Sequence, residues 1–136
     1  MSLRKLPLLA TIVLVALWAI AFTATHWPLR QEPNEILFPH ADKIAHMTIY
    51  AVLAFVSLLA LRAWNYRWTP LLAVLVGLAM VALGMFDELT QMLVAGRTPD
   101  PADLLADTIG AGLGIGAYAL ARAIYARQNY SPSEPR

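Results

Sequence analysis

The sequence predicts an all-α polytopic membrane protein, a four-helix transmembrane bundle with both termini in the cytoplasm. Its 136 residues are 59% hydrophobic and only 14% charged, and the mean hydropathy is +0.57. Soluble domains carry about 25% charged residues. The chain has no cysteine, which excludes disulfides and thiolate chemistry, and it has no basic patch that would suit a nucleic acid. We therefore expect the membrane lipid bilayer to surround most of the chain.

Four apolar segments are long enough to cross a bilayer core of about 30 Å, which takes about 20 helical residues. The predicted spans are residues 6–25, 43–61, 70–94 and 101–125. The first is interpreted as a permanent anchor, because the apolar part of a cleaved signal has only about 7 to 15 residues. The third begins at Pro70, and the fourth begins at Pro101 after Asp100, which predicts an N-cap. Residues 1–126 are therefore predicted to form one transmembrane domain, and 127–136 a disordered cytoplasmic tail.

The distribution of charge orients the predicted bundle. With a cytoplasmic N-terminus, seven of the ten Lys and Arg residues lie on the cytoplasmic side and three on the other side. The positive-inside rule favours this orientation. Eight of the nine acids then lie on or near the outer side. The sequence thus predicts a multi-pass protein of the bacterial plasma (inner) membrane whose polar residues face the outside or the periplasm.

Three of the four spans carry polar residues four positions apart near the outer side. The pairs are Asp42 and His46, Asp87 and Gln91, and Asp103 and Asp107, with Tyr50 one turn beyond His46. This spacing puts both members of a pair on one helix face. At about 1.5 Å per residue, Asp87 and Asp107 lie roughly 10 to 12 Å from their shared loop, and so at similar depth. An ionisable residue inside a membrane costs about 2.5 to 3.5 kcal/mol, so a functional or paired role is expected.

These residues form the predicted site. The candidate catalytic residues are His46, Asp87, Glu88 and Asp107, and the candidate substrate-binding residues are Asp42, Tyr50, Gln91, Arg97 and Asp103. Neighbouring acids and burial both disfavour ionised carboxylates, so the acids need protons, bonds to Arg97 and His46, or a divalent cation. Such a cation would be held by Asp87, Glu88, Asp103 and Asp107, because hard cations prefer oxygen ligands. Simpler roles are a helix cap for Asp42 and a snorkelling interface position for Lys43.

Glycines are spaced for close helix packing on the fourth span. Gly110 and Gly114 continue the face of Asp103 and Asp107, and a second pair, Gly112 and Gly116, has the same spacing. Small residues four apart let transmembrane helices approach closely. Both pairs are predicted to pack against neighbouring helices.

The combined motifs resemble the VanZ-like family. They are Asp42-Lys43-x-x-His46-x-x-x-Tyr50, Asp87-Glu88-x-x-Gln91, Gly96-Arg97 and Asp103-x-x-x-Asp107-x-x-Gly110-x-x-x-Gly114. The resemblance covers residues from about 39 to 116 and implies a small multi-span membrane protein. A founding member of that family is associated with teicoplanin resistance. Asp107 stands where the family pattern leads us to expect asparagine.

Three classes of function fit these observations, and the sequence leaves open whether the protein is an enzyme. The first is binding or modification of an envelope lipid, a lipid-linked envelope precursor or an anionic lipid headgroup at the outer leaflet. The second is a proton- or ion-coupled transporter, although no repeated half or broken helix is evident. The third is a non-catalytic membrane scaffold. A serine hydrolase is excluded, because Ser57 lies about 16 Å along the helix from His46.

Overall fold

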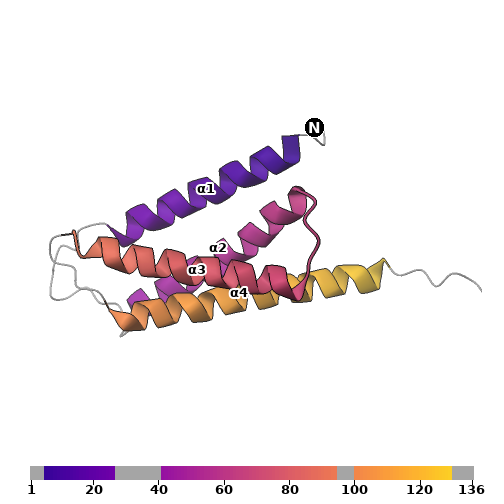
Figure 1. The fold of residues 1–136 in the computed structure, drawn as a ribbon. Coiled ribbons are helices and arrows are strands. Elements are labelled where there is room, and N and C mark those ends of the chain that lie inside the picture. Colours follow the sequence, from indigo (N-terminus) through magenta and orange to yellow (C-terminus); the bar gives the residue numbers. More distant parts are fainter. Residues whose placement is uncertain (1–4, 27–40, 95–99, 130–136) are drawn as a thin grey trace, which may run out of the picture.

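The computed structural model describes residues 5–26, 41–94 and 100–129, and all the secondary structure in this part of the chain is helical. The helices are α1 (Leu6–Thr25), α2 (Ala41–Ala63), α3 (Pro70–Gln91) and α4 (Pro101–Gln128). Each is long and apolar enough to cross a membrane. They run alternately up and down the bundle (Figure 1). The predicted all-α bundle of four spanning helices is confirmed.

Helix ends differ from the predicted spans by a few residues. α3 ends at Gln91 instead of 94, and hydrogen-bonded turns follow it, with the Val94 N–H donating to the Gln91 carbonyl at 2.9 Å. α4 continues through Gln128, so the first residues of the predicted tail are helical, while 130–136 lie outside the described residues. Asp100 caps α4 as predicted, because its carboxylate accepts from the Ala102 N–H at 2.9 Å.

The closest packing in the bundle joins α2 to α4 through one of the two glycine pairs. A Cβ added at Gly110 would lie 2.1 Å from the Met47 carbonyl oxygen, and one added at Gly114 would lie 2.1 Å from that of Ala51. Only glycine allows the two backbones to come this close. The second pair behaves differently: no atom of the described chain lies within 4 Å of a Cβ added at Gly112 or Gly116. The prediction that this pair also packs against a helix is wrong, because it faces away from α2.

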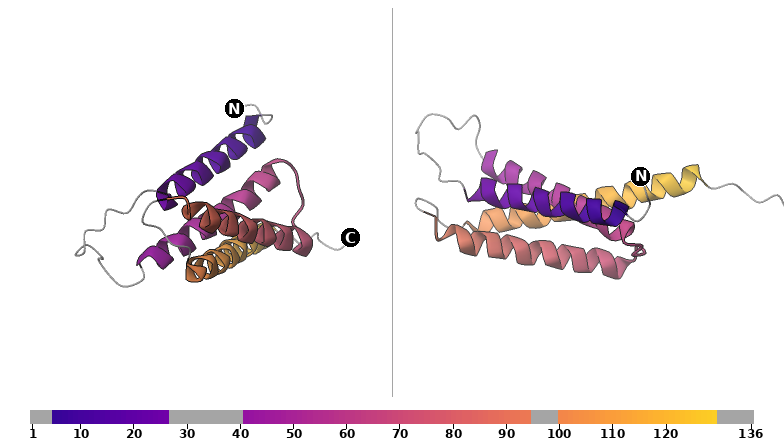
Figure 2. Two further views of the ribbon diagram at one scale, coloured as in Figure 1. Left: turned by 60° about the vertical axis from the view of Figure 1, so that its left-hand side comes forward. Right: turned by 90° about the horizontal axis from the view of Figure 1, so that it is seen from above.

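α1 lies at the edge of the bundle. Figure 1 shows α1 and α3 close together where both helices end, and diverging toward the N-terminus of α1. The left view in Figure 2 shows the same separation. Farther from that shared end, α1 contacts α2 and the turn after it, where the Trp64 indole donates to the Thr11 hydroxyl at 2.9 Å. α1 is therefore held mainly by α2 and by the end of α3.

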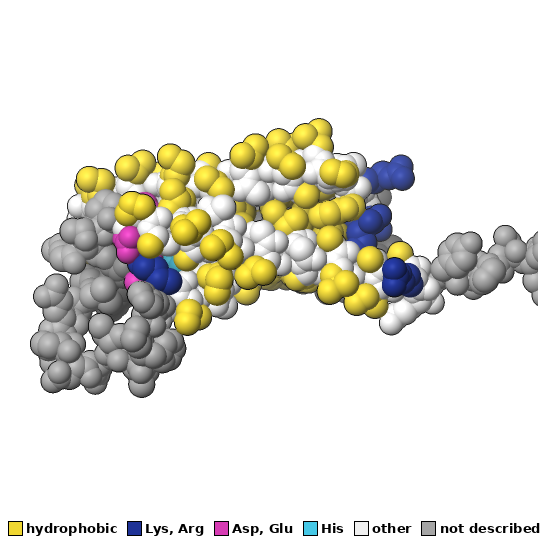
Figure 3. Space-filling model, turned by 90° about the horizontal axis from the view of Figure 1, so that it is seen from below, with side chains coloured by type: hydrophobic (Ala, Val, Ile, Leu, Met, Phe, Trp, Pro, Cys, Tyr) yellow, Lys and Arg dark blue, Asp and Glu magenta, His cyan; other side chains and the backbone are white. Residues whose placement is uncertain are grey.

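The outer surface has an apolar belt between two charged ends. Figure 3 shows hydrophobic side chains over the middle of the bundle, acids at one end, and a group of Lys and Arg at the other. The core between the helices includes Leu53, Ala54, Leu58, Val76, Met80, Ala111 and Tyr118. The described chain starts and finishes at the same end of the bundle, away from the acids (Figure 1). Which end faces the cytoplasm remains a prediction.

Candidate polar site

Polar side chains gather where α1 and α3 end and α2 and α4 begin. The alternating direction of the helices brings these four helix ends together. The buried polar residues there are Thr25, His46, Asp87, Glu88, Gln91, Asp103 and Asp107. We call this group, together with His26, Asp42, Lys43, Tyr50 and Asp100 around it, the polar site. It unites the described residues of the predicted site from three helices and adds residues from α1.

His46 and Asp107 form a buried pair across the α2–α4 interface. His46 Nδ1 lies 3.0 Å from Asp107 Oδ1, and the two residues are 5% and 1% exposed. With Asp107 Oδ1 as the acceptor, the hydrogen of a neutral His46 lies on Nδ1, and the Nε2 lone pair is available for a proton. Nε2 lies 4.0 Å from Asp103 Oδ2. The close approach at Gly110, one turn after Asp107, sets the distance between the two helices that carry this pair.

Asp87 is held by residues from two helices. The Thr25 hydroxyl donates to Asp87 Oδ1 at 2.9 Å, and the Gln91 amide donates to Oδ2 at 2.8 Å. His26 Nδ1 lies 3.5 Å from Oδ1, and His26 Nε2 lies 2.9 Å from the Thr90 hydroxyl oxygen. Thr25 and His26 were not among the predicted site residues. Both stand at the outer end of the first span, where polar residues are ordinary, so their position alone did not mark them.

Lys43 bridges the acids at the rim of the polar site. Its ammonium group donates to Asp100, to Asp103 Oδ1 at 2.5 Å, and lies 3.0 Å from Asp42 Oδ2. The sequence predicted a snorkelling interface position for Lys43, and the structure adds ion pairs with carboxylates at the start of α4. The hydrogen bond from Lys43, with that from the Ala102 N–H, holds the pKa of the Asp100 carboxyl below its usual range.

Two carboxylate oxygens in the polar site are buried without a hydrogen-bond partner among the described residues. They are Glu88 Oε1 and Asp107 Oδ2. The other Glu88 oxygen accepts from the Asp100 N–H at 2.8 Å. A Cβ added at Gly84 would lie 2.9 Å from Asp107 Oδ2, so this oxygen points at α3. A buried unsatisfied polar atom costs about 1 to 3 kcal/mol, so each oxygen calls for a proton, a water or a ligand group.

The four carboxylates proposed as metal ligands are directed to separate partners. Asp87 is bonded to Thr25 and Gln91, and Asp103 to Lys43. Within residues 5–26, 41–94 and 100–129, no three His, Asp or Glu side chains are arranged to hold one metal ion. In the described geometry these acids are engaged by hydrogen bonds and an ion pair.

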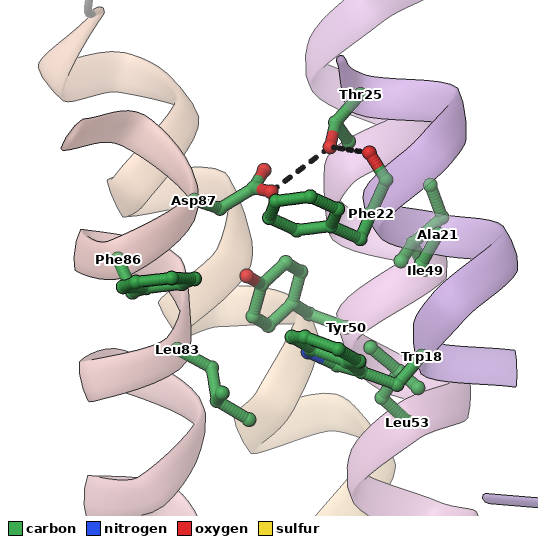
Figure 4. A pocket seen from close by; sticks show the side chains of 10 residues that line it. All are labelled: Trp18, Ala21, Phe22, Thr25, Ile49, Tyr50, Leu53, Leu83, Phe86 and Asp87. Atoms are coloured by element: carbon green, nitrogen blue, oxygen red, sulfur yellow. Dashed lines mark hydrogen bonds between the residues drawn. The ribbon is translucent and has the colours of Figure 1, made fainter. Parts of the chain in front are cut away.

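Tyr50 and Asp87 line a small pocket between α1, α2 and α3, closed on one side by Phe22 (Figure 4). Its volume is about 10 Å³. A water needs about 10 to 15 Å³, so the pocket has room for about one. Arg97, the predicted partner of the acids, lies outside the described residues. Ser57 lies deeper in α2, and its hydroxyl donates to the Leu53 carbonyl at 2.7 Å.

A comparison with protein families confirms the resemblance. The family model described as VanZ/LLP1 matches residues 4–122. The match spans α1, α2, α3, most of α4 and every residue of the polar site. No curated protein and no solved structure matches the chain.

Proposed function

The chain belongs to the VanZ/LLP1 family, and from that premise we propose that its polar site binds or modifies a lipid or lipid-linked precursor of the cell envelope. The observation that carries the proposal is the buried His46–Asp107 pair beside two carboxylate oxygens that lack described partners. The site lies at the ends of four helices that can span a membrane, where we expect the polar headgroups of lipids to meet their chains. An ionisable group kept at this depth is expected to act on a ligand.

His46 is the proposed proton carrier. Asp107 orients the imidazole through Nδ1, so that Nε2 can take a proton from a hydroxyl or amino group of the substrate and return it. General acid–base catalysis of this kind contributes about 10²- to 10⁴-fold. The His46–Asp107 pair thus takes part either in catalysis or, if no bond is changed, in holding a ligand hydroxyl or amine.

The proposed ligand contacts follow from the donors and acceptors of the site. Glu88 Oε1 and Asp107 Oδ2 would accept hydrogen bonds from hydroxyl or ammonium groups of a headgroup. Lys43, and Arg97 outside the described residues, would bind the phosphate of an anionic lipid. A headgroup carrying both a phosphate and hydroxyl or amino groups would use both kinds of contact.

We expect the polar site to face the outside of the cell. Single cysteines can test this without background, because the natural chain has none. A membrane-impermeant maleimide should label Thr98→Cys, in the segment that joins α3 to α4, in intact cells or spheroplasts. Arg67→Cys, between α2 and α3 at the other end, should react only after the cells are permeabilised. The reverse pattern would show that the site faces the cytoplasm.

Exchanging the proton-transfer pair should abolish function while the protein still folds. His46→Ala and Asp107→Asn should each reduce an envelope phenotype, such as altered glycopeptide susceptibility in a suitable host, to the level without the protein. Asp87→Asn and Glu88→Gln should weaken it. Thr108→Val is the matched control, because the Thr108 hydroxyl bonds back to the Leu104 carbonyl of its own helix. If activity falls only in proportion to the amount of folded protein, the polar residues act as a scaffold.

A further inference from the structure

An apolar cavity of about 270 Å³ lies between α1, α2 and α3, deeper in the bundle than the polar site. Val15 of α1, Ser57 of α2 and Met80 of α3 are among its lining residues. The hydroxyl of Ser57 already donates to the Leu53 carbonyl of its own helix at 2.7 Å. The cavity thus gives water little to bond to, and a cavity of this kind favours hydrocarbon.

This cavity shares part of its lining with the small pocket at the edge of the polar site. Trp18, Leu53 and Leu83 line both the cavity and the small pocket that contains Asp87 (Figure 4). The three residues come from α1, α2 and α3. A ligand in the cavity would therefore have one end near Asp87 and Thr25 and the other near Ser57.

The length of this path corresponds to one leaflet of a bilayer. Ser57 lies eleven residues beyond His46 on α2, which is about 16 Å at the rise of a helix. The hydrocarbon core of a bilayer is about 30 Å thick, so the path is about half as long as the core is thick. Val15 lines the cavity and is 57% exposed, so the cavity opens on the α1 side toward the surrounding lipid.

We propose that this cavity holds one acyl chain of a membrane lipid whose headgroup lies in the polar site. The assignment rests on the proposed function for the headgroup, and it adds the substrate class: a lipid that enters sideways between α1 and α3. The bilayer presents acyl chains to this opening at high local concentration. Their extended length matches the path from the membrane boundary to mid-depth.

Photocrosslinking can test the assignment on the full chain. The probe is phosphatidylglycerol with a diazirine in the middle of one acyl chain, titrated into delipidated protein in detergent. We expect a saturable adduct, one lipid per chain, mapped by mass spectrometry to the Met80–Leu83 segment. Val15→Trp should reduce this adduct about tenfold or more, which corresponds to about 1.4 kcal/mol of binding free energy. Equal labelling of Val15→Trp and the wild type would overturn the assignment.

Val13→Trp is the matched control, since it makes the same change on α1 at a residue that is 44% exposed and does not line the cavity. Its adduct should equal that of the wild type. Ser57→Leu fills the same cavity from α2 and should also lose the adduct. It therefore tests the assignment without any change to α1. If Val15→Trp keeps the adduct while His46→Ala loses the phenotype, the acyl assignment fails and the proposed function stands. If the adduct is lost in Val15→Trp but His46→Ala keeps the phenotype, the cavity binds lipid and the proposed function fails.

Discussion

Replacing Gly110 with alanine is expected to force α2 and α4 apart and to destabilise the bundle by at least the roughly 1 to 3 kcal/mol that overpacking costs. The added Cβ would lie 2.1 Å from the Met47 carbonyl oxygen and 2.8 Å from its carbon. These are backbone atoms, so no side-chain rotation relieves the contact. Because Met47 follows His46, the displacement should also lengthen the His46–Asp107 hydrogen bond.

The measurement is thermal unfolding of purified protein in detergent. Gly114→Ala should behave like Gly110→Ala, because its Cβ would meet the Ala51 carbonyl oxygen at the same distance of 2.1 Å. Gly112→Ala is the matched control on the same helix, where no described atom lies within 4 Å of the new Cβ. It should be neutral or slightly stabilising, since alanine favours a helix over glycine by up to about 1 kcal/mol. Equal destabilisation by Gly110→Ala and Gly112→Ala would contradict the packing described here.

The glycine stripes show how far the sequence could determine the fold. Hydropathy, length and the Asp100-Pro101 start predicted four spanning helices with ends correct to within a few residues. Spacing alone made Gly110/Gly114 and Gly112/Gly116 equally good packing faces. Only the position of α2 decides between them, and that position depends on contacts distant in the sequence.

The polar site was predicted where an ionisable residue interrupts an apolar span. Asp87, Glu88 and Asp107 carry that signal by themselves, because charge is rare at membrane depth. Thr25 and His26 do not, since polar residues at the end of a span are ordinary. They belong to the site only because α1 ends beside Asp87.

The ion pairs of Lys43 could not be predicted for a related reason. A lysine near the end of a spanning helix can extend its ammonium group to water or to any carboxylate within reach. The start of α4 supplies Asp100 and Asp103 at that point. Its partners therefore depend on how α4 packs on α2. The spacing of residues along α2 cannot predict that packing.

Replacing Lys43 with glutamine is expected to destabilise the folded protein at neutral pH. The variant removes the cation that lies between Asp42, Asp100 and Asp103. A hydrogen bond to a charged group contributes about 1.5 to 3 kcal/mol, and the bond to Asp103 should lie toward the lower end because the Lys43 side chain is 22% exposed. Lys43→Arg keeps the charge and should recover much of the loss.

The loss in Lys43→Gln should depend on pH, and its sign follows from Asp100. Lys43 lowers the pKa of Asp100 in the folded state. This pairing therefore stabilises the protein fully above the pKa that Asp100 has in the unfolded chain, about 3.9. The stabilisation is lost as the pH falls through the lower pKa of the folded state. The difference in melting temperature between the wild type and Lys43→Gln should therefore be large at pH 7 and small at acidic pH. Arg62→Gln, in the last turn of the same helix and away from the acids, should show no such change. If the difference in melting temperature stays constant from pH 7 to acidic pH, Lys43 stabilises the bundle by packing and not through its ion pairs.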